Sequence, residues 1–172
     1  MFNKIKAFDR NIIAYIDKKF SCRVMDKIMK AVTFLGDYGI VWAILIVYLF
    51  FKGKTIEGFS VLCSLASTSL LNEKILKKIF KRTRPANELS YKNLLIKIPS
   101  SYSFPSGHTA TAFAVVPLAI SFGTAIGTLS IIAASIIGFS RVYLKVHYLT
   151  DVLMGCFIGT SMSIITYLIV FI

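Results

Sequence analysis

Five long apolar runs limit this chain to folds built from membrane helices. The runs cover residues 39–51 (extending back towards residue 35), 56–71, 106–122, 128–143 and 148–172. An α-helix needs about 20 apolar residues to cross a bilayer, and the runs are near that length, some a little short. Hydrophobic residues make up 56% of the chain, compared with roughly 45–50% in soluble domains. We therefore predict an all-α fold, a polytopic membrane helical bundle with about five transmembrane helices.

Two amphipathic segments precede the apolar runs. Residues 3–19 and 22–35 place apolar side chains at helical spacing, and charged side chains interrupt both segments. This pattern is typical of helices that lie in the membrane interface. We expect two interfacial helices within residues 1–35, and six transmembrane helices if one of them inserts. The 172 residues fit a single domain, in which residues 36–172 form the transmembrane bundle.

Glycine and proline predict where the helices break. The helix of the second run is expected to continue to about Arg82, before a polar loop at residues 86–104. Pro117 lies inside the third run and predicts a kink, because proline lacks the backbone N–H of a helix interior. Gly123 and Gly127 predict a tight turn between the third and fourth helices.

The charge balance indicates anionic partners. The chain carries 20 Lys and Arg against 8 Asp and Glu, a formal net charge of +12. The basic residues flank apolar runs and form no soluble basic face, so we expect lipid headgroups or phosphorylated substrates as partners, and no nucleic acid. Cys22, Cys63 and Cys156 are odd in number and lack CxxC spacing, which favours neither a disulfide framework nor a zinc site.

Three polar clusters, far apart in sequence, are predicted to meet on one side of the membrane. They are Lys77, Lys81 and Arg84 at spacing i, i+4 and i+7, then Pro105-Ser106-Gly107-His108 at a helix start, then Arg141, His147 and Asp151. Five alternating helices would bring all three to the same face. Taken singly, basic residues at a helix end usually reach into headgroups, and a Ser-Gly pair is usually only a cap. Together, at one depth, the clusters indicate a phosphate site.

Five of these residues are suited to hold a phosphoryl group. Ser106 is a candidate N-cap, and Gly107 lets the backbone N–H groups of the helix start approach an anion. Arg84 and Arg141 can each bind two phosphoryl oxygens, and Lys77 adds a point charge. The same clusters contain both histidines of the chain.

The histidines supply a nucleophile and an acid/base partner without any metal. On a helix, His147 and Asp151 are i and i+4, so the carboxylate could accept the imidazole N–H and leave the other ring nitrogen free to attack. His108 is then the second histidine of the site. Lys78 and Arg82 lie on the opposite helical face from Lys77, and we assign them to solvent or lipid.

The three clusters resemble the signature of the type 2 phosphatidic acid phosphatase (PAP2) superfamily. That signature is Lys-x6-Arg-Pro, Pro-Ser-Gly-His and Ser-Arg-x5-His-x3-Asp, and this chain matches it without departure at residues 77–85, 105–108 and 140–151. The likeness extends to the hydrophobic layout of most of the chain. The vanadium haloperoxidases share the signature but are soluble, so they resemble this chain less.

The resemblance implies a role for each signature residue. His147 would attack phosphorus and form a phosphohistidine, Asp151 would orient it, and His108 would protonate the leaving oxygen and then activate water. Charge on the phosphoryl oxygens would be stabilised by Lys77, Arg84, Ser106, Gly107 and Arg141. No metal cofactor is implied.

The resemblance also implies a lipid substrate. The likeness to short bacterial members with a similar interfacial N-terminus favours undecaprenyl diphosphate as the substrate, which would be hydrolysed to undecaprenyl phosphate and phosphate. Phosphatidylglycerophosphate, phosphatidic acid and lipid A phosphate are the alternative substrates. A catalytically silent protein that binds or transports lipid phosphates is the alternative outside enzymes. Membrane lipids are the other expected partners, and the sequence does not indicate an oligomeric state.

The side of the membrane on which the site lies is contested by two arguments. The predicted site side carries Lys81, Arg82, Lys92, Lys97 and Lys145, whereas the opposite turns carry Lys52 and Lys54. The positive-inside rule therefore places the site in the cytoplasm, but the resemblance places it on the extracytoplasmic face of a bacterial cytoplasmic membrane. We expect the extracytoplasmic face, because charges that bind substrate inflate the count.

Overall fold

The chain folds entirely into helices in the part that the structure describes. The computed structural model describes residues 2–37, 39–89 and 94–172, and no strand occurs among them. The elements are α1 (Phe2–Phe20), α2 (Arg23–Asp37), α3 (Ile40–Phe51), α4 (Thr55–Leu70), the π-helical segment η1 (Leu71–Leu76), α5 (Lys77–Phe80), α6 (Pro85–Glu88), α7 (Gly107–Phe113), α8 (Val116–Phe122), α9 (Thr124–Tyr143) and α10 (Leu149–Phe171). The predicted all-α fold is confirmed.

In the part of the chain that the structure describes, two helices are long and apolar enough to cross a membrane by themselves. They are α9 and α10, and the bent pair α2 and α3 would make a third span if it is counted as one. The apolar stretch Gly107–Phe122 is shorter and is broken between α7 and α8. The count of about five transmembrane helices therefore stays a prediction.

The break between α7 and α8 lies where the sequence places a proline. Pro117 is in the first turn of α8, and α7 ends at Phe113, the residue whose carbonyl the proline ring would crowd. The Leu118 N–H donates instead to Ser163 Oγ of α10 (3.2 Å). The predicted kink is thus confirmed, and a side chain of the neighbouring helix satisfies an amide near it.

The predicted turn at Gly123 and Gly127 is half right. Gly123 has φ 146° and separates α8 from α9, but Gly127 lies inside α9. A Cβ on Gly127 would come within 2.8 Å of the Ile120 Cα. Gly127 is therefore needed for the close approach of α9 to α8, and not for the turn.

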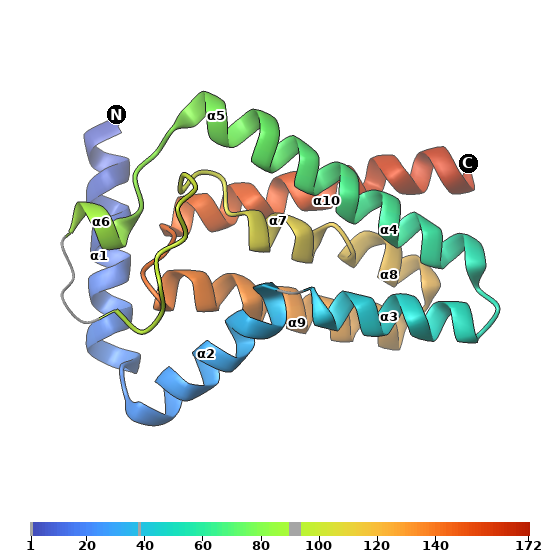
Figure 1. Ribbon diagram of the computed structural model, residues 1–172, viewed down its shortest axis with the longest axis horizontal. Coiled ribbons are helices and arrows are strands. Elements are labelled where there is room, and N and C mark those ends of the chain that lie inside the picture. Colours follow the sequence, from blue (N-terminus) through green and yellow to red (C-terminus); the bar gives the residue numbers. More distant parts are fainter. Residues whose placement is uncertain (1, 38, 90–93) are drawn as a thin grey trace.

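Helix α10 is the element against which most of the bundle packs. It contacts α7, α4, α8, α9 and α1, and Figure 1 shows it running lengthwise beside α4 and α7. A Cβ on Gly155 would come within 2.7 Å of the Ser106 carbonyl oxygen, and a Cβ on Gly159 would clash with the Ala110 carbonyl oxygen. Small residues allow helix backbones to approach closely inside membranes. These two glycines hold the start of α7 against α10.

The predicted N-terminal helices are present, and α1 is tied to the protein along one face. It lies across one end of the bundle, beside α6 (Figure 1). Ile13 packs against Val142 and Tyr148, and the Asp9 carboxylate accepts hydrogen bonds from the backbone N–H (3.1 Å) and hydroxyl (2.6 Å) of Thr150. Phe8 is 49% exposed on the other side, as expected for a helix with one lipid-facing side.

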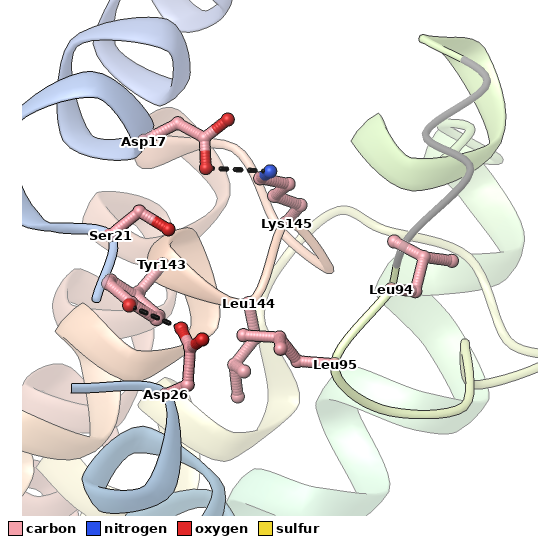
Figure 2. A pocket seen from close by; sticks show the side chains of 8 residues that line it. All are labelled: Asp17, Ser21, Asp26, Leu94, Leu95, Tyr143, Leu144 and Lys145. Atoms are coloured by element: carbon pink, nitrogen blue, oxygen red, sulfur yellow. Dashed lines mark hydrogen bonds and ion pairs between the residues drawn. The ribbon is translucent and has the colours of Figure 1, made fainter. Parts of the chain in front are cut away.

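Leu94 and Leu95 line a cavity together with Ser21, which lies in the turn between α1 and α2. Residues 90–93 of the predicted loop lie outside the described residues, but Leu95 and Ile96 pack against Met29, Tyr143 and Leu144. Figure 2 shows this cavity, which has a volume of about 270 Å³, with Leu94 and Leu95 across from Ser21 and the Asp17–Lys145 and Tyr143–Asp26 contacts on its wall. The loop is thus packed against the end of α9, close to the signature residues.

The close approach of α10 to α7 predicts that an added methyl group at Gly159 destabilises the protein. In Gly159→Ala the new Cβ meets the backbone of α7, including the Ala114 nitrogen at 2.8 Å. Backbone cannot move as a side chain can, so we expect a loss of about 1–3 kcal/mol. The measurement is the midpoint of thermal unfolding in detergent.

Gly138→Ala is the matched control on α9. The atoms nearest its Cβ would be side-chain atoms, Val152 Cγ1 at 3.3 Å and Thr109 Cγ2 at 3.5 Å, and alanine favours helix over glycine by about 1 kcal/mol. We expect little change in the midpoint. Equal destabilisation by both variants would contradict this account of the α7–α10 contact.

Candidate active site

The three predicted clusters reach one cavity of about 240 Å³ at the end of the bundle near α1. Of the predicted site residues, Lys77, Arg84, Gly107, His108 and His147 line this cavity. Gly36, Asp37, Ser69, Asn72, Glu73, Pro99, Ser101 and Thr111 complete its wall. Ser106, Arg141 and Asp151 are buried beside it. The predicted convergence is therefore present in the structure.

Backbone hydrogen bonds tie the clusters to one another. The Ser106 N–H donates to the Asp151 carbonyl oxygen (3.0 Å), which joins the start of α7 to the first turn of α10. The Ala86 N–H donates to the Lys145 carbonyl oxygen (3.0 Å), which joins the segment after Arg84 to the loop before His147. The relative positions of the signature residues are thus set by the main chain.

His147 does not lie on a helix with Asp151, contrary to the i, i+4 prediction. Helix α9 ends at Tyr143, Lys145 adopts a left-handed conformation (φ 60°), and α10 begins at Leu149 with Tyr148 as its N-cap. The chain must turn between the two helices, so His147 lies in the connection. Its Nδ1 is 3.6 Å from Asp151 Oδ2, which is too long for a hydrogen bond.

The surroundings of His147 select one tautomer. Nδ1 is 2.7 Å from the Ser103 carbonyl oxygen, and a carbonyl can only accept, so Nδ1 carries the proton. Nε2 is 3.0 Å from Arg84 Nη1, and a guanidinium can only donate, so Nε2 keeps its lone pair. Nε2 therefore carries the lone pair of the ring, which accepts from Arg84 in this structure, and an electrophile reaches it when that hydrogen bond opens.

Burial keeps His147 uncharged. The side chain is 1% exposed, and this desolvation lowers the pKa of His147 to about 3, against the smaller opposing effect of Asp151. The imidazole is therefore neutral at pH 7, the state that a nucleophile requires.

Asp151 is fully buried and all its hydrogen bonds come from the protein. Oδ2 accepts from the Ser103 hydroxyl (2.5 Å) and from the Tyr148 N–H (2.9 Å), and Oδ1 accepts from Arg82 Nη1 (2.7 Å). The Tyr148 contact also caps α10, because Asp151 is the third residue of that helix. Asp151 thus reaches His147 through Ser103, whose carbonyl holds the imidazole.

Arg82 was assigned to solvent or lipid, and that prediction is wrong. The helix ends at Phe80 because Lys81 adopts a left-handed conformation (φ 45°), so a helical wheel does not place the residues beyond it. For the same reason Lys77, Lys81 and Arg84 do not share a helical face: Lys81 is exposed, whereas Arg84 is buried in an extended segment.

Lys77 and Arg84 form the basic wall of the cavity. Lys77 Nζ contacts Glu73 Oε1 (2.5 Å) and Ser101 Oγ (3.1 Å). Arg84 donates from Nε to the Ser101 carbonyl oxygen (2.9 Å) and from Nη1 to the Val146 carbonyl oxygen (2.8 Å). Both cations are thus held in place before any ligand arrives.

The start of α7 has the geometry predicted for it. Ser106 is the N-cap, and its hydroxyl accepts from the Thr109 N–H (3.4 Å). A Cβ on Gly107 would come within 2.7 Å of Glu73 Oε1 and 3.2 Å of Asn72 Nδ2. A side chain at this position would crowd the cavity wall, and the predicted approach of the Gly107 backbone to an anion stays a prediction.

His108 and Arg141 share a carboxylate that the sequence did not single out. Asp37, the last residue of α2, contacts His108 Nε2, and the same carboxylate oxygen is 3.5 Å from Arg141 Nη1. Arg141 also donates to Thr33, and its buried Nε has no hydrogen-bond partner. No spacing in the sequence links Asp37 to these residues, which lie about 70 and 100 positions away.

Among the described residues, no group of three or more His, Cys, Asp and Glu side chains is arranged to hold a metal ion. The histidines of the site contact one carboxylate each, Asp37 for His108 and Asp151 for His147.

Comparison with known proteins confirms the family resemblance. The family model for the PAP2 superfamily matches residues 57–172. Phosphatidylglycerophosphatase B of Bacillus subtilis (strain 168) is 32% identical over 149 residues, 78% of this chain and 70% of that protein. An undecaprenyl-diphosphatase of Sulfolobus acidocaldarius is 31% identical over 137 residues, 77% of this chain and 66% of that protein. A solved transmembrane PAP2 type phosphatidylglycerolphosphate phosphatase from Bacillus subtilis superposes with a TM-score of 0.81 and 28% identity, over 97% of this chain and 86% of that one.

The tautomer and the lowered pKa of His147 can be measured directly, because the chain has only two histidines. We expect the ¹⁵N imidazole spectrum of the detergent-solubilised protein to show one histidine protonated on Nδ1 that does not titrate between pH 8 and pH 5. The sign follows from burial: a pKa near 3 leaves the ring neutral throughout this range. The signals of His147→Ala assign the two residues, and titration of His147 near the ordinary value of about 6.5 would contradict the analysis.

Proposed function

This chain belongs to the PAP2 superfamily of membrane lipid phosphatases, and we propose that it hydrolyses a lipid phosphate or diphosphate through a phosphohistidine on His147. The observation that carries the proposal is the orientation of that imidazole. Its unprotonated Nε2 lies at a cavity whose wall includes Lys77, Arg84 and His108. A neutral nucleophile beside fixed cations fits attack on a phosphoryl group.

The reaction would proceed in two displacements. The His147 Nε2 lone pair attacks phosphorus, the bond from phosphorus to the leaving oxygen breaks, and His108 gives that oxygen a proton. His108 then takes a proton from water, whose oxygen attacks phosphorus and releases phosphate and the free imidazole. Asp151 would orient His147 through Ser103, since the direct contact is too long for a hydrogen bond.

The phosphoryl oxygens would be held from two sides. Lys77 and Arg84 lie on one wall of the cavity, and the Gly107 backbone with its Ser106 cap lies on another. Arg141 lies behind His108, where both now contact Asp37. A phosphate bound between His108 and Arg141 would replace that carboxylate, which is 44% exposed and can move away from them.

We propose undecaprenyl diphosphate as the substrate, with phosphatidylglycerophosphate as the second candidate. Relatives named for each activity match this chain at similar identity, 31% and 32%. Phosphatidic acid and lipid A phosphate are phosphomonoesters, as phosphatidylglycerophosphate is, and would present the same chemistry to the cavity. The lipid tail would remain in the bilayer around the bundle.

We propose that the site faces outward from a bacterial cytoplasmic membrane. Two of the basic residues that favoured the cytoplasmic side are occupied by carboxylates of the protein: Arg82 contacts Asp151, and Lys145 is 2.8 Å from Asp17. Acidic partners change the positive-inside count little, so the outward placement rests on the family resemblance. Lys92 lies outside the described residues.

The function is tested by phosphate release from undecaprenyl diphosphate, phosphatidylglycerophosphate and phosphatidic acid in detergent with EDTA. We expect release that survives EDTA and is abolished in His147→Ala. Arg84→Gln should lower kcat/KM about 10²- to 10³-fold, the usual loss when one donor to a transition-state oxygen is removed.

Lys78→Gln is the matched control for charge, because Lys78 is exposed and does not line the cavity. Its rate should stay close to that of the wild type. Release that requires added metal, or that persists in His147→Ala, would overturn the proposed mechanism, and the relative rates identify the preferred lipid.

A further inference from the structure

Arg82 lies between two fully buried carboxylates from opposite ends of the chain. Its Nη2 donates to Asp9 Oδ2 (2.8 Å), and its Nη1 donates to Asp151 Oδ1 (2.7 Å) and to the Thr150 hydroxyl (2.8 Å). Asp9 and Asp151 are both 0% exposed. Two buried anions this close to each other repel, and a planar guanidinium can bind both at once.

Contacts with Tyr148, Asp9 and Asp151 fix the position of Arg82. Its guanidinium lies over the Tyr148 ring, 3.9 Å from the centroid. Asp9 holds Nη2, and two hydrogen bonds from Thr150 hold Asp9 in turn. The guanidinium therefore has one orientation, in which Nη1 faces Asp151.

Arg82 also controls Ser103, the residue that orients His147. The Arg82 carbonyl oxygen accepts from the Ser103 N–H (2.8 Å). The Ser103 hydroxyl donates to the carboxylate that Arg82 holds, and the Ser103 carbonyl accepts from His147 Nδ1. Arg82 thus acts on Ser103 both through its main chain and through Asp151, and every link from Asp9 to His147 is a hydrogen bond.

We propose that Arg82 and Asp9 are positioning residues for the nucleophile, so that the N-terminal helix α1 is part of the catalytic apparatus. The proposal rests on the proposed function, in which His147 Nε2 attacks phosphorus. Arg82 fixes the Asp151 carboxylate, Asp9 fixes Arg82, and the result is a single orientation and tautomer of His147. Neither residue lines the cavity described above, so both would act on the rate without touching the phosphoryl group there.

The test compares Arg82→Gln, Arg82→Lys and Asp9→Asn with the wild type on the lipid that it hydrolyses fastest. We expect kcat to fall about 10- to 100-fold in Arg82→Gln, the usual loss when a partner that orients a reactive ligand is removed, with KM nearly unchanged. Arg82→Lys should recover only part of the rate, because an ammonium keeps the charge but cannot bridge two carboxylates. In Asp9→Asn kcat should also fall, by a smaller factor than in Arg82→Gln.

Asp17→Asn is the matched control on α1. Asp17 pairs with Lys145 (2.8 Å), as Figure 2 shows, so this variant also removes an ion pair that holds α1 to the bundle, but one away from Asp151. We expect less than about a twofold change in kcat. An equal loss in Asp17→Asn and Asp9→Asn would show that only the attachment of α1 matters and would overturn the proposal.

A double-mutant cycle separates positioning from folding. In an Asp151→Asn background, Arg82→Gln should have almost no further effect on the rate of phosphoenzyme formation, because the group through which it acts is already changed. If Arg82→Gln lowered the rate of phosphoenzyme formation by the same factor in the wild-type and Asp151→Asn backgrounds, the proposal would be contradicted.

The ¹⁵N spectrum of His147 provides a readout that does not need turnover. We expect a mixture of tautomers in Arg82→Gln and a single tautomer in Asp17→Asn. If the wild type released no phosphate from any lipid, the proposed function would fail by that result alone. An unchanged His147 tautomer in Arg82→Gln would overturn the positioning role whether or not the wild type is active.

Discussion

The burial of Asp151 is the constraint on which the rest of the site depends. An unpaired carboxylate at the start of an apolar helix would be very costly, and this one is saturated by Ser103, Tyr148 and Arg82. Each of these partners also makes a second contact. Ser103 holds the imidazole of His147, Tyr148 is the N-cap of α10, and Arg82 binds the N-terminal helix through Asp9. The same contacts that neutralise the carboxylate therefore assemble the nucleophile.

The packing of the bundle brings the phosphate-binding residues to that nucleophile. Glycines on α10 let α7 approach, and the Ser106 N–H then bonds to the Asp151 carbonyl. The left-handed Lys81 ends the helix of Lys77 at Phe80, so that an extended segment carries Arg84 to the cavity. Hydrogen bonds within the protein hold Lys77 and Arg84 in place. Asp37 is half-exposed, and it is the carboxylate that a bound phosphate would displace.

The sequence predicted the all-helical fold and the meeting of the three clusters, because apolar runs alternate across a membrane and leave few arrangements. The sequence-based predictions were wrong at the positions where the backbone departs from helical conformation. The predictions for Arg82 and for His147 both assumed that the helix continues past a neighbouring lysine. Lys81 and Lys145 instead adopt left-handed conformations, with φ 45° and 60°. Asp9, Asp37 and Ser103 could not be found, since their partners lie between about 20 and 140 positions away and no spacing rule connects them.

The most direct test of the central claim is the identity of the phosphorylated atom. The wild-type protein, mixed with the lipid that it hydrolyses fastest carrying ³²P in the terminal phosphate, is quenched in alkali within one turnover. The orientation of His147 predicts label on its Nε2, because Nδ1 donates its proton to the Ser103 carbonyl. Label on Nδ1 or on His108, or turnover without any phosphohistidine, would contradict the account.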